Sequence, residues 1–366
     1  MKETRFLCYN KRNRVCVVFH MNTKKQLPIP PHFDEKKVGE VWRVSYQEIA
    51  NTAQNWAIQY DIPPVSPSQK RIGLLLIDIQ NTFCLPGFEL FVGGQSGRGA
   101  IDDNVRLCQF IYRNLAQITD IIVTMDTHNV MQIFHPIFWV NQAGENPTPA
   151  ATIITLEDVQ NGIWRVNPAV AHSLSNGDYE KLQKHALHYV KTLSNEGKYP
   201  LTIWPYHSML GGIGHALVSA IEEAVFFHNI CRQNQTIFEM KGSHPLTENY
   251  SVLRPEVLYS EDGSPLLDKK FTLIEKLLQF DKIIIAGQAK SHCVAWTIED
   301  LLTVIKTIDV NFAKKIYLLD DCTSAVVVPG VIDFTEQANA TYARFADAGM
   351  HQVKSSQNLE TWPKFS

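Results

Sequence analysis

One cysteine lies where a strand, a tight loop and a helix are expected to meet. Cys293 follows the apolar run 282–286 and Gly287, and a helical pattern begins at it. The unpaired N–H groups and the positive dipole end of a helix start favour a thiolate over a thiol and could hold an oxyanion. This context predicts a nucleophile, although an inert buried residue is the commoner role of a cysteine.

Successive predicted strands end at residues that can do chemistry. Because the ligand crevice of an open α/β sheet lies beyond the carboxyl ends of its strands, we expect these side chains to meet there. They are Asp78, Asp126 with His128, His207, Lys241 and Cys293.

Three of these residues combine a thiol, a carboxylate and an ammonium group. A carboxylate beside a thiol can take its proton, and a nearby ammonium keeps that carboxylate ionised. The expected catalytic set is therefore Asp78, Lys241 and Cys293.

The other three residues are of types that bind metals. Asp126 and His128 are two apart on an extended segment and so point to the same side, and His207 arrives from another strand end. Three protein ligands with open positions are typical of a catalytic metal site. Taken alone, an Asp-Thr-His segment is more often a capped turn.

The elements that must position these residues alternate between strand and helix patterns from residue 71 onward. This alternation predicts a three-layer α/β/α domain, residues 71–366, with a mostly parallel sheet of roughly six strands. Strands are expected at 72–77, 121–124, 201–204, 236–240, 282–286 and 315–319, and helices near 101–117, 170–193, 214–229 and 334–348 and from 293 onward.

Two segments lie outside this alternation. Residues 1–70 are predicted to form an N-terminal extension, with a hairpin at 5–19 and a helix at 45–60, packed on the main domain. An oligomer contact, and with it a homo-oligomer, is the alternative. The insert at about 141–198 is expected to border the crevice and to narrow the substrate range towards small, flat amides. Its alternative role is peripheral packing.

Composition excludes several classes of protein. A net charge of −3 without a basic cluster argues against nucleic-acid binding. The longest apolar runs are too short to span a bilayer, and the N-terminus lacks the pattern of a signal peptide. Seven irregularly spaced cysteines give no disulfide framework. We expect a soluble, cytoplasmic protein that acts on a small molecule.

The sequence resembles the isochorismatase-like cysteine hydrolases, and among them the nicotinamidases. The resemblance covers residues 71 to the end of the sequence, and its fragments occur in the order of the family. They are DIQNTF at 78–83, DTH at 126–128, IWPYH at 203–207, KG at 241–242, ENYS at 248–251 and GQAKSHCV at 287–294.

The resemblance implies roles for individual residues. It implies a catalytic triad of Asp78, Lys241 and Cys293, and a divalent metal, usually zinc, on Asp126, His128 and His207. A non-proline cis peptide bond between Gln288 and Ala289 is implied as well. The backbone N–H groups of Ala289 and Cys293 would then form the oxyanion hole.

The metal set favours nicotinamidases, enzymes of NAD metabolism, over relatives that lack it. In those enzymes the metal is thought to hold the pyridine nitrogen while the cysteine attacks the carboxamide. Aromatic residues near the motifs could enclose such a ring, or could belong to the core instead. They are Phe83, Phe134, Phe138 and Trp139.

The sequence also departs from the family pattern. His135 lies seven residues beyond His128, a wider spacing than usual, and Ser291-His292 replaces the usual acidic–aromatic pair before the cysteine. These changes leave the chemistry intact and bear on the substrate. In the insert, His185 and His188 suggest either a second metal site or solvated helix residues.

The expected function is that of a metal-dependent cysteine amidohydrolase converting nicotinamide to nicotinate and ammonia through a thioester. One alternative is a hydrolase of another small amide or ureido compound at the same Asp-Lys-Cys site. A second is a non-catalytic metal-binding member of the fold.

Overall fold

The structure is a computed structural model that describes residues 26–196, 199–267 and 271–365. The hairpin predicted at 5–19 lies outside the described residues. Of the predicted extension, the structure describes 26–70, which includes helix α1 (Tyr46–Gln59).

The centre of the structure is a six-stranded sheet in which all neighbouring strands are parallel. The chain leaves β1 towards β2 and β7, and then returns to the other side of β1 to add β8, β9 and β12. The order is therefore β12-β9-β8-β1-β2-β7, and the predicted fold class is confirmed. The strands are β1 (Ile72–Ile77), β2 (Asp120–Asp126), β7 (Ile237–Lys241), β8 (Lys282–Gly287), β9 (Ile316–Leu319) and β12 (His351–Val353).

One predicted member of this sheet was wrong. The segment expected at 201–204 contributes only β6 (Leu201–Thr202), which pairs antiparallel with β4 (Ile153–Ile154) outside the main sheet. Its apolar residues Leu201 and Ile203 are buried in the core of the insert. The sixth strand is instead β12, which has no apolar run that would reveal it.

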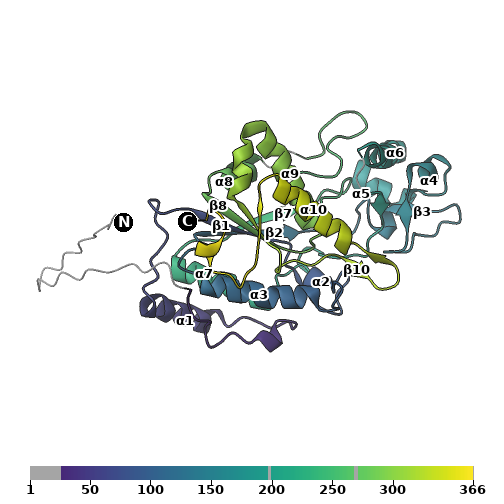
Figure 1. Ribbon diagram of the computed structural model, residues 1–366. Coiled ribbons are helices and arrows are strands. Elements are labelled where there is room, and N and C mark those ends of the chain that lie inside the picture. The colour runs from purple at the N-terminus through teal and green to yellow at the C-terminus, as the bar shows by residue number, and fades with distance from the viewer. Residues whose placement is uncertain (1–25, 197–198, 268–270, 366) are drawn as a thin grey trace, which may run out of the picture.

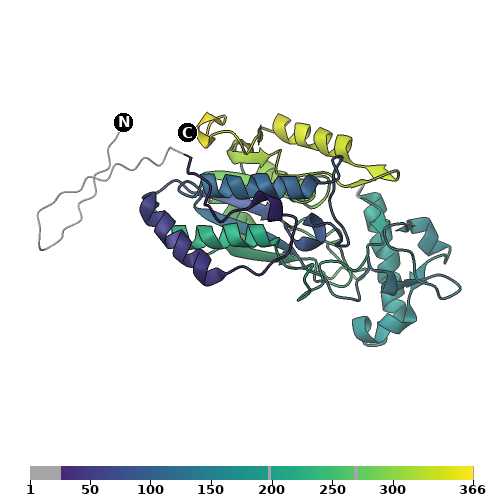
Figure 2. The same cartoon turned by 90° about the horizontal axis from the view of Figure 1, so that it is seen from below.

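Helices cover both faces of the sheet (Figures 1 and 2). One face carries α3 (Gly99–Arg113) and α7 (Ser219–Arg232), with α1 packed against α7; the other carries α8 (Phe271–Leu278), α9 (Cys293–Ile308) and α10 (Thr335–Asp347).

Alternate residues of each central strand enter the two cores. Leu74 and Leu76 of β1 belong to the core beneath α3 and α7, whereas Leu75 and Ile77 belong to the core beneath α8 and α9. Burying one such side chain contributes roughly 1.5–3 kcal/mol. This alternation explains why β1 is apolar at nearly every position.

The insert has a hydrophobic core of its own, built from residues between Ile133 and Ile203 together with Val257. The single helix expected at 170–193 is divided at Asn176, whose backbone is left-handed with φ 53°. Asp178 then caps the second part by accepting a hydrogen bond from the Lys181 N–H. The elements here are β3 (Trp139–Val140), β5 (Arg165–Val166), α4 (Leu156–Gln160), α5 (Ala171–Ser175) and α6 (Tyr179–Asn195).

Two smaller elements complete the described structure. A short helix, α2 (Asn81–Cys84), follows β1, and β10 (Val327–Val328) pairs with β11 (Ile332–Asp333) as a hairpin before α10. In residues 26–196, 199–267 and 271–365, no helix combines the length and the apolar character needed to cross a membrane.

A buried histidine of α7 makes the stability of this fold depend on pH. His228 is 1% exposed, contacts the Ile118 carbonyl oxygen through Nε2 at 3.1 Å, and has a pKa lowered by burial from 6.5 to about 4. Between these two pH values the unfolded chain binds a proton that the folded chain does not. The stabilisation is therefore present above pH 6.5 and is lost as the pH falls towards 4.

We expect His228→Gln to reduce the fall in stability between pH 6.5 and pH 4 by roughly 3 kcal/mol, because glutamine can keep a hydrogen bond to Ile118 but does not titrate in this range. Urea unfolding of both proteins across this pH range measures the difference. Parallel curves of unfolding free energy against pH would show that His228 does not contribute.

Candidate active site

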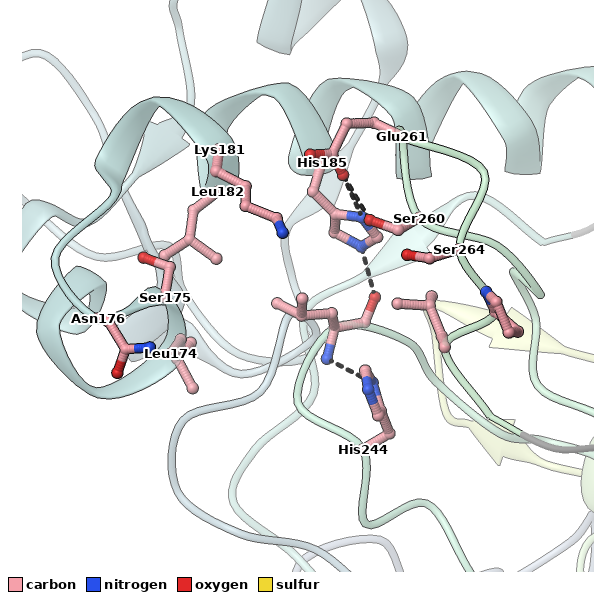
Figure 3. Close-up of a pocket in the computed structure, with 13 residues that line it drawn as sticks. Leu174, Ser175, Asn176, Lys181, Leu182, His185, His244, Ser260, Glu261 and Ser264 are labelled. Atoms are coloured by element: carbon pink, nitrogen blue, oxygen red, sulfur yellow. Dashed lines mark hydrogen bonds and ion pairs between the residues drawn. The ribbon is translucent and has the colours of Figure 1, made fainter.

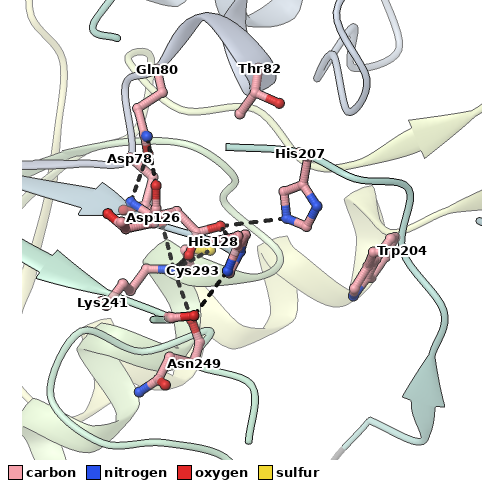
Figure 4. Close-up of polar contacts among 12 residues, drawn as sticks. Asp78, Gln80, Thr82, Asp126, His128, Trp204, His207, Lys241, Asn249 and Cys293 are labelled. Carbon is pink, nitrogen blue, oxygen red and sulfur yellow. Dashed lines mark hydrogen bonds and ion pairs between the residues drawn. The ribbon is translucent and has the colours of Figure 1, made fainter. Parts of the chain in front are cut away.

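The predicted site residues meet at the carboxyl ends of the central strands. Asp78 follows β1, Asp126 ends β2, Lys241 ends β7, and Cys293 begins α9 after the loop that leaves β8. From β1 the chain continues to β2, on one side in the strand order, and from the adjacent β8 it continues to β9, on the other side. The strand order therefore reverses between β1 and β8, and such a topological switch point is where α/β folds place their ligand crevices. Figure 4 shows that these side chains come together, joined by His128 and His207.

The thiol, the carboxylate and the ammonium are in mutual contact. Lys241 Nζ lies 3.0 Å from Asp78 Oδ2 and 3.6 Å from Cys293 Sγ, and the thiol shares a hydrogen bond with Asp78. All three residues are buried. Lys241 Nζ also donates to the Asn249 carbonyl oxygen at 2.8 Å, which fixes the direction of the ammonium group.

Asp78 is oriented by its neighbour on β2. The Thr124 hydroxyl donates to Asp78 Oδ1 at 2.5 Å and accepts a hydrogen bond from the Asp78 N–H at 3.1 Å. The Asp78 backbone is left-handed, with φ 48°, an uncommon conformation for a residue other than glycine. These contacts leave Oδ2 to face Lys241.

The electrostatics favour a neutral thiol at rest. Burial raises the pKa of Cys293 well above its usual value, and the carboxylates of Asp78 and Asp126 add to this effect against the opposing effect of Lys241. The thiolate predicted from the helix start is therefore not the resting form that this structure favours. A base must take the thiol proton when the sulfur attacks.

Lys241 stays charged despite its burial. Desolvation alone would lower its pKa, but the attraction of Asp126 and Asp78 outweighs it and raises the pKa well above the usual lysine value. The ammonium thus contacts both carboxylates, with Asp126 Oδ1 at 2.8 Å.

Asp126, His128 and His207 form a compact group of metal-ligand type. Asp126 Oδ2 lies 2.8 Å from His128 Nε2 and 3.5 Å from His207 Nε2, and one ligand atom from each residue falls within 4.8 Å of the others. Within the described part of the chain, no second group of three such residues is found.

The hydrogen bonds of the two histidines suit a metal ion. His128 Nδ1 contacts the Gly242 carbonyl oxygen at 3.0 Å, and His207 Nδ1 contacts that of Pro205 at 2.7 Å. In a neutral imidazole each Nδ1 must then carry the proton, so that both Nε2 lone pairs face the Asp126 carboxylate. Three electron-pair donors converging without a proton between them are what a divalent cation requires.

Gly242 makes this packing possible. A Cβ at this position would lie 2.6 Å from His128 Cε1 and 2.8 Å from Asp126 Oδ1, and the backbone φ is +83°. The packing of Asp126 and His128 therefore requires a glycine at the position after Lys241.

His135 lies beside this group and outside it. Its ring centroid is 5.9 Å from those of His128 and His207, and its Nδ1 contacts the Val130 carbonyl oxygen at 3.1 Å. Burial and the two neighbouring histidines lower its pKa to about 3, so His135 is neutral.

The N–H groups of Ala289 and Cys293, which were expected to form an oxyanion hole, lie in the loop that follows β8 and at the start of α9. The peptide bond between Gln288 and Ala289 is cis, as the family resemblance implied. Among the described residues, neither the Ala289 N–H nor the Cys293 N–H donates a hydrogen bond to protein. Both remain available to an oxygen of a substrate.

Of the four predicted pocket aromatics, two lie against the metal-ligand histidines and two do not. The Phe83 ring is 5.9 Å from that of His207, and the Phe134 ring is 4.8 Å from that of His128, measured between centroids. Trp139 is fully buried in the core of the insert, where its Nε1 donates to the Ile133 carbonyl oxygen. Phe138 packs against it in the same core.

The sequence reasoning missed an aromatic wall around His292, the residue before Cys293. His292 is surrounded by the rings of Tyr199, Trp204, Tyr250 and Phe334, with centroid distances of 5.0–6.3 Å. Trp204 and Tyr250 belong to the motif fragments IWPYH and ENYS, so the motifs could have indicated that these two residues lie near the site. No sequence motif pointed to Tyr199 or Phe334.

Gln80, also overlooked as a site residue, holds Asp126 in place through the main chain. Its Nε2 donates to the Asp126 carbonyl oxygen at 2.8 Å, and its Oε1 accepts from the Asp126 N–H at 2.7 Å. This two-point contact joins the ends of β1 and β2 and fixes the start of the metal group. The position of Gln80 within the DIQNTF fragment was the available signal.

A cavity of about 310 Å³ lies between α5, α6 and the segment 244–266, and none of the predicted catalytic or metal-ligand residues lines it (Figure 3). His185 lines it but is 1% exposed, so the expectation of a solvated helix residue was wrong for this histidine. Its Nε2 contacts the Leu246 carbonyl oxygen at 2.8 Å, and its Nδ1 lies 3.4 Å from Glu261 Oε2. These contacts account for its burial without a metal.

We expect purified protein to carry close to one divalent ion, and His128→Ala or His207→Ala to lose it or weaken its binding, because each removes one of three converging donors. His135→Ala, which removes an adjacent buried imidazole, should retain the ion and serves as the control. Metal content after dialysis measures this. Loss in His135→Ala together with retention in His207→Ala would overturn the assignment.

No protein-family model matches this sequence, and no curated protein sequence matches it. Solved structures do match by fold. One is a nicotinamidase/pyrazinamidase of Acinetobacter baumannii, with 16% identity over 79% of this chain and 98% of that chain, and a TM-score of 0.46.

Two further matches have similar coverage. A pyrazinamidase of Pyrococcus horikoshii in complex with zinc has 15% identity over 78% of this chain and 99% of that chain, with a TM-score of 0.41. An N-carbamoylsarcosine amidase from Thermoplasma acidophilum has 12% identity over 78% and 98%, with a TM-score of 0.38. These structures are of amide-hydrolysing enzymes, the group that the sequence motifs resemble.

Proposed function

We propose that this chain is a metal-dependent cysteine amidohydrolase and that its substrate is nicotinamide, which it hydrolyses to nicotinate and ammonia. The observation that carries the proposal is one ammonium shared by two sets of residues. Lys241 Nζ contacts Asp78 and Cys293 on one side and Asp126 of the metal-ligand group on the other. A nucleophile with its base thus lies directly beside a place for a cation.

Acylation begins with the neutral thiol. Asp78, which shares a hydrogen bond with Cys293, takes the thiol proton as the sulfur attacks the carboxamide carbon. The oxygen of the tetrahedral intermediate is held by the N–H groups of Ala289 and Cys293. Asp78 returns the proton to the leaving nitrogen, ammonia departs, and a thioester remains on Cys293.

Deacylation uses the same carboxylate to move a proton from water to the sulfur. Asp78 takes a proton from a water molecule, which attacks the thioester, and the proton returns to the sulfur as the carboxylic acid product leaves. Burial raises the pKa of Asp78, and the charge of Lys241 opposes this effect and so favours the ionised carboxylate between the two steps.

Asp126, His128 and His207 would hold the divalent metal, zinc by the family resemblance. When bound, the ion supplies a Lewis acid that can hold the ring nitrogen of the substrate. The role of this chain is to direct three donors to one point and to place that point beside the nucleophile.

The surroundings of the site support a small, flat substrate. Phe83 and Phe134 lie against the metal-ligand histidines, and the aromatic wall around His292 stands next to Cys293. Tyr199, which follows the predicted insert, reaches this wall and donates to the Ser291 carbonyl oxygen at 3.1 Å. This contact places Tyr199, the residue directly after the predicted insert, against the segment that leads into Cys293.

An assay of ammonia release across nicotinamide, pyrazinamide and a panel of small amide and ureido compounds tests the function. We expect Cys293→Ala to lower kcat roughly 10⁴-fold or more while the fold and metal content stay unchanged. Cys108→Ala, which removes an equally buried thiol of α3, is the matched control. Residual activity of more than a few per cent in Cys293→Ala would refute the cysteine mechanism, and turnover of ureido compounds alone would reassign the substrate.

Asp78 and Lys241 should act as one unit. Asp78→Asn removes the base and Lys241→Ala the charge that keeps it ionised, so each should reduce kcat severely, and the double variant should be little worse than either single one. Steady-state kinetics of the three variants measures this coupling. Losses that simply multiply would show that the two residues serve separate steps.

A further inference from the structure

A buried aspartate of α3, outside all the motifs, is hydrogen-bonded to the loop that carries the nucleophile. Asp103 is 2% exposed and accepts hydrogen bonds from Gln288 Nε2 at 2.8 Å, from Arg106 at 2.8 Å and from the hydroxyl of Ser324. It touches none of the groups to which the mechanism above assigns a chemical role.

Gln288 is held at both ends of its side chain and at its backbone. Its Nε2 donates to Asp103, its Oε1 accepts from the Ser324 N–H at 3.3 Å, and its own N–H donates to the Ile77 carbonyl oxygen at 2.9 Å. The residue is fully buried. Gln288 therefore has a single orientation as long as these partners are present.

The partners of Gln288 are themselves fixed to each other. Gly99 at the start of α3 approaches Ser324 so closely that a Cβ there would lie 2.6 Å from the Ser324 Oγ. Arg106 Nε donates to the Asp321 carbonyl oxygen at 2.5 Å, and the Lys290 N–H donates to that of Ser324 at 2.8 Å. These contacts join three segments into one unit: α3, the segment 321–324 and the loop 287–290.

We propose that Asp103 is a positioning residue for the oxyanion hole. It fixes Gln288, and through Gln288 the peptide unit whose nitrogen is the Ala289 N–H, in the direction in which this N–H meets the oxygen of the tetrahedral intermediate. The inference rests on the proposed function and extends it to a residue that does not contact the substrate.

Loss of this contact should affect the transition state more than the bound substrate. Without Asp103, the buried Gln288 amide loses its acceptor, and the peptide unit can turn. A displacement of about 1 Å can cost roughly 100-fold in rate, and an oxyanion forms only during the reaction. The effect therefore falls on kcat and spares KM.

The first comparison uses two neighbouring aspartates of α3. We expect Asp103→Ala to lower kcat for nicotinamide by about 10- to 100-fold with KM changed by less than about twofold. Asp102→Ala is the matched control, because Asp102 is partly exposed and forms an ion pair with the exposed side chain of Arg98. Equal kinetics in the two variants would overturn the proposal.

The second comparison reverses the polarity of the hydrogen bond. Gln288→Glu places a carboxylate against Asp103 and should reduce kcat strongly. Adding Asp103→Asn restores a donor on residue 103 and an acceptor on residue 288, and should recover at least about tenfold of that loss. A double variant no better than Gln288→Glu alone would refute the coupling.

A readout without turnover separates this inference from the proposed function. An aldehyde analogue of the substrate, pyridine-3-carbaldehyde, can add to Cys293: the sulfur bonds to the aldehyde carbon, and the thiol proton ends on the former carbonyl oxygen. Asp103→Ala should weaken this adduct, whereas alkylation of Cys293 by iodoacetamide, which needs no oxyanion hole, should keep its rate.

The outcomes are distinct. Wild-type protein that forms the adduct but hydrolyses no amide would refute the proposed substrate and still allow the variants to be compared. Equal loss of alkylation and of adduct affinity in Asp103→Ala would show that Asp103 supports the nucleophile or the fold instead, and would overturn the proposal.

Discussion

The charge of Lys241 holds the two halves of this site together. Asp78 and Asp126 are both buried at the same sheet edge, and two carboxylates so placed would repel each other and resist desolvation. The ammonium group of Lys241 lies between them, 3.0 Å from Asp78 and 2.8 Å from Asp126. Its positive charge offsets their mutual repulsion and the loss of hydration on burial. It also orders the site spatially, with the thiol beyond one carboxylate and the histidines beyond the other.

The sheet itself, and not a set of long loops, positions the charged residues Asp78, Asp126 and Lys241. β1 pairs with β2 on one side and with β8 on the other, and β7 pairs with β2, so the residues at their ends are set by backbone registers. The Asp126↔Lys241 pairing is itself part of the β2–β7 register. His207 is different, because it comes from the segment that follows the insert, and so the metal group joins the sheet to the insert.

The site was more predictable from sequence than its surroundings. Asp78, Asp126, Lys241 and Cys293 could be placed together because each follows a predicted strand and parallel strands share an edge. Trp139 could not be separated from Phe134 in the same way: both are buried in the core of the insert, but only Phe134 also contacts the ring of His128.

Other features had no signal in the sequence because they depend on contacts between distant segments. β12 is a three-residue strand whose place is decided by pairing with β9. The neutral state of the Cys293 thiol follows from two carboxylates and full burial, which the local helix start could not reveal.

The attachment of β9 has a consequence for the order in which the site can be completed during synthesis. The segment after β12 fastens the end of β9: the Ser355 N–H and hydroxyl both bind the Asp321 carboxylate, and Lys354 binds that of Asp320. Asp321 leads directly into Ser324, the partner of Gln288. All the proposed catalytic and metal-ligand residues are thus made by the ribosome before the residues that bind the end of β9. Until residues 351–355 have emerged, a nascent chain would lack β12 and the contacts that bind the carboxylates of Asp320 and Asp321 at the end of β9.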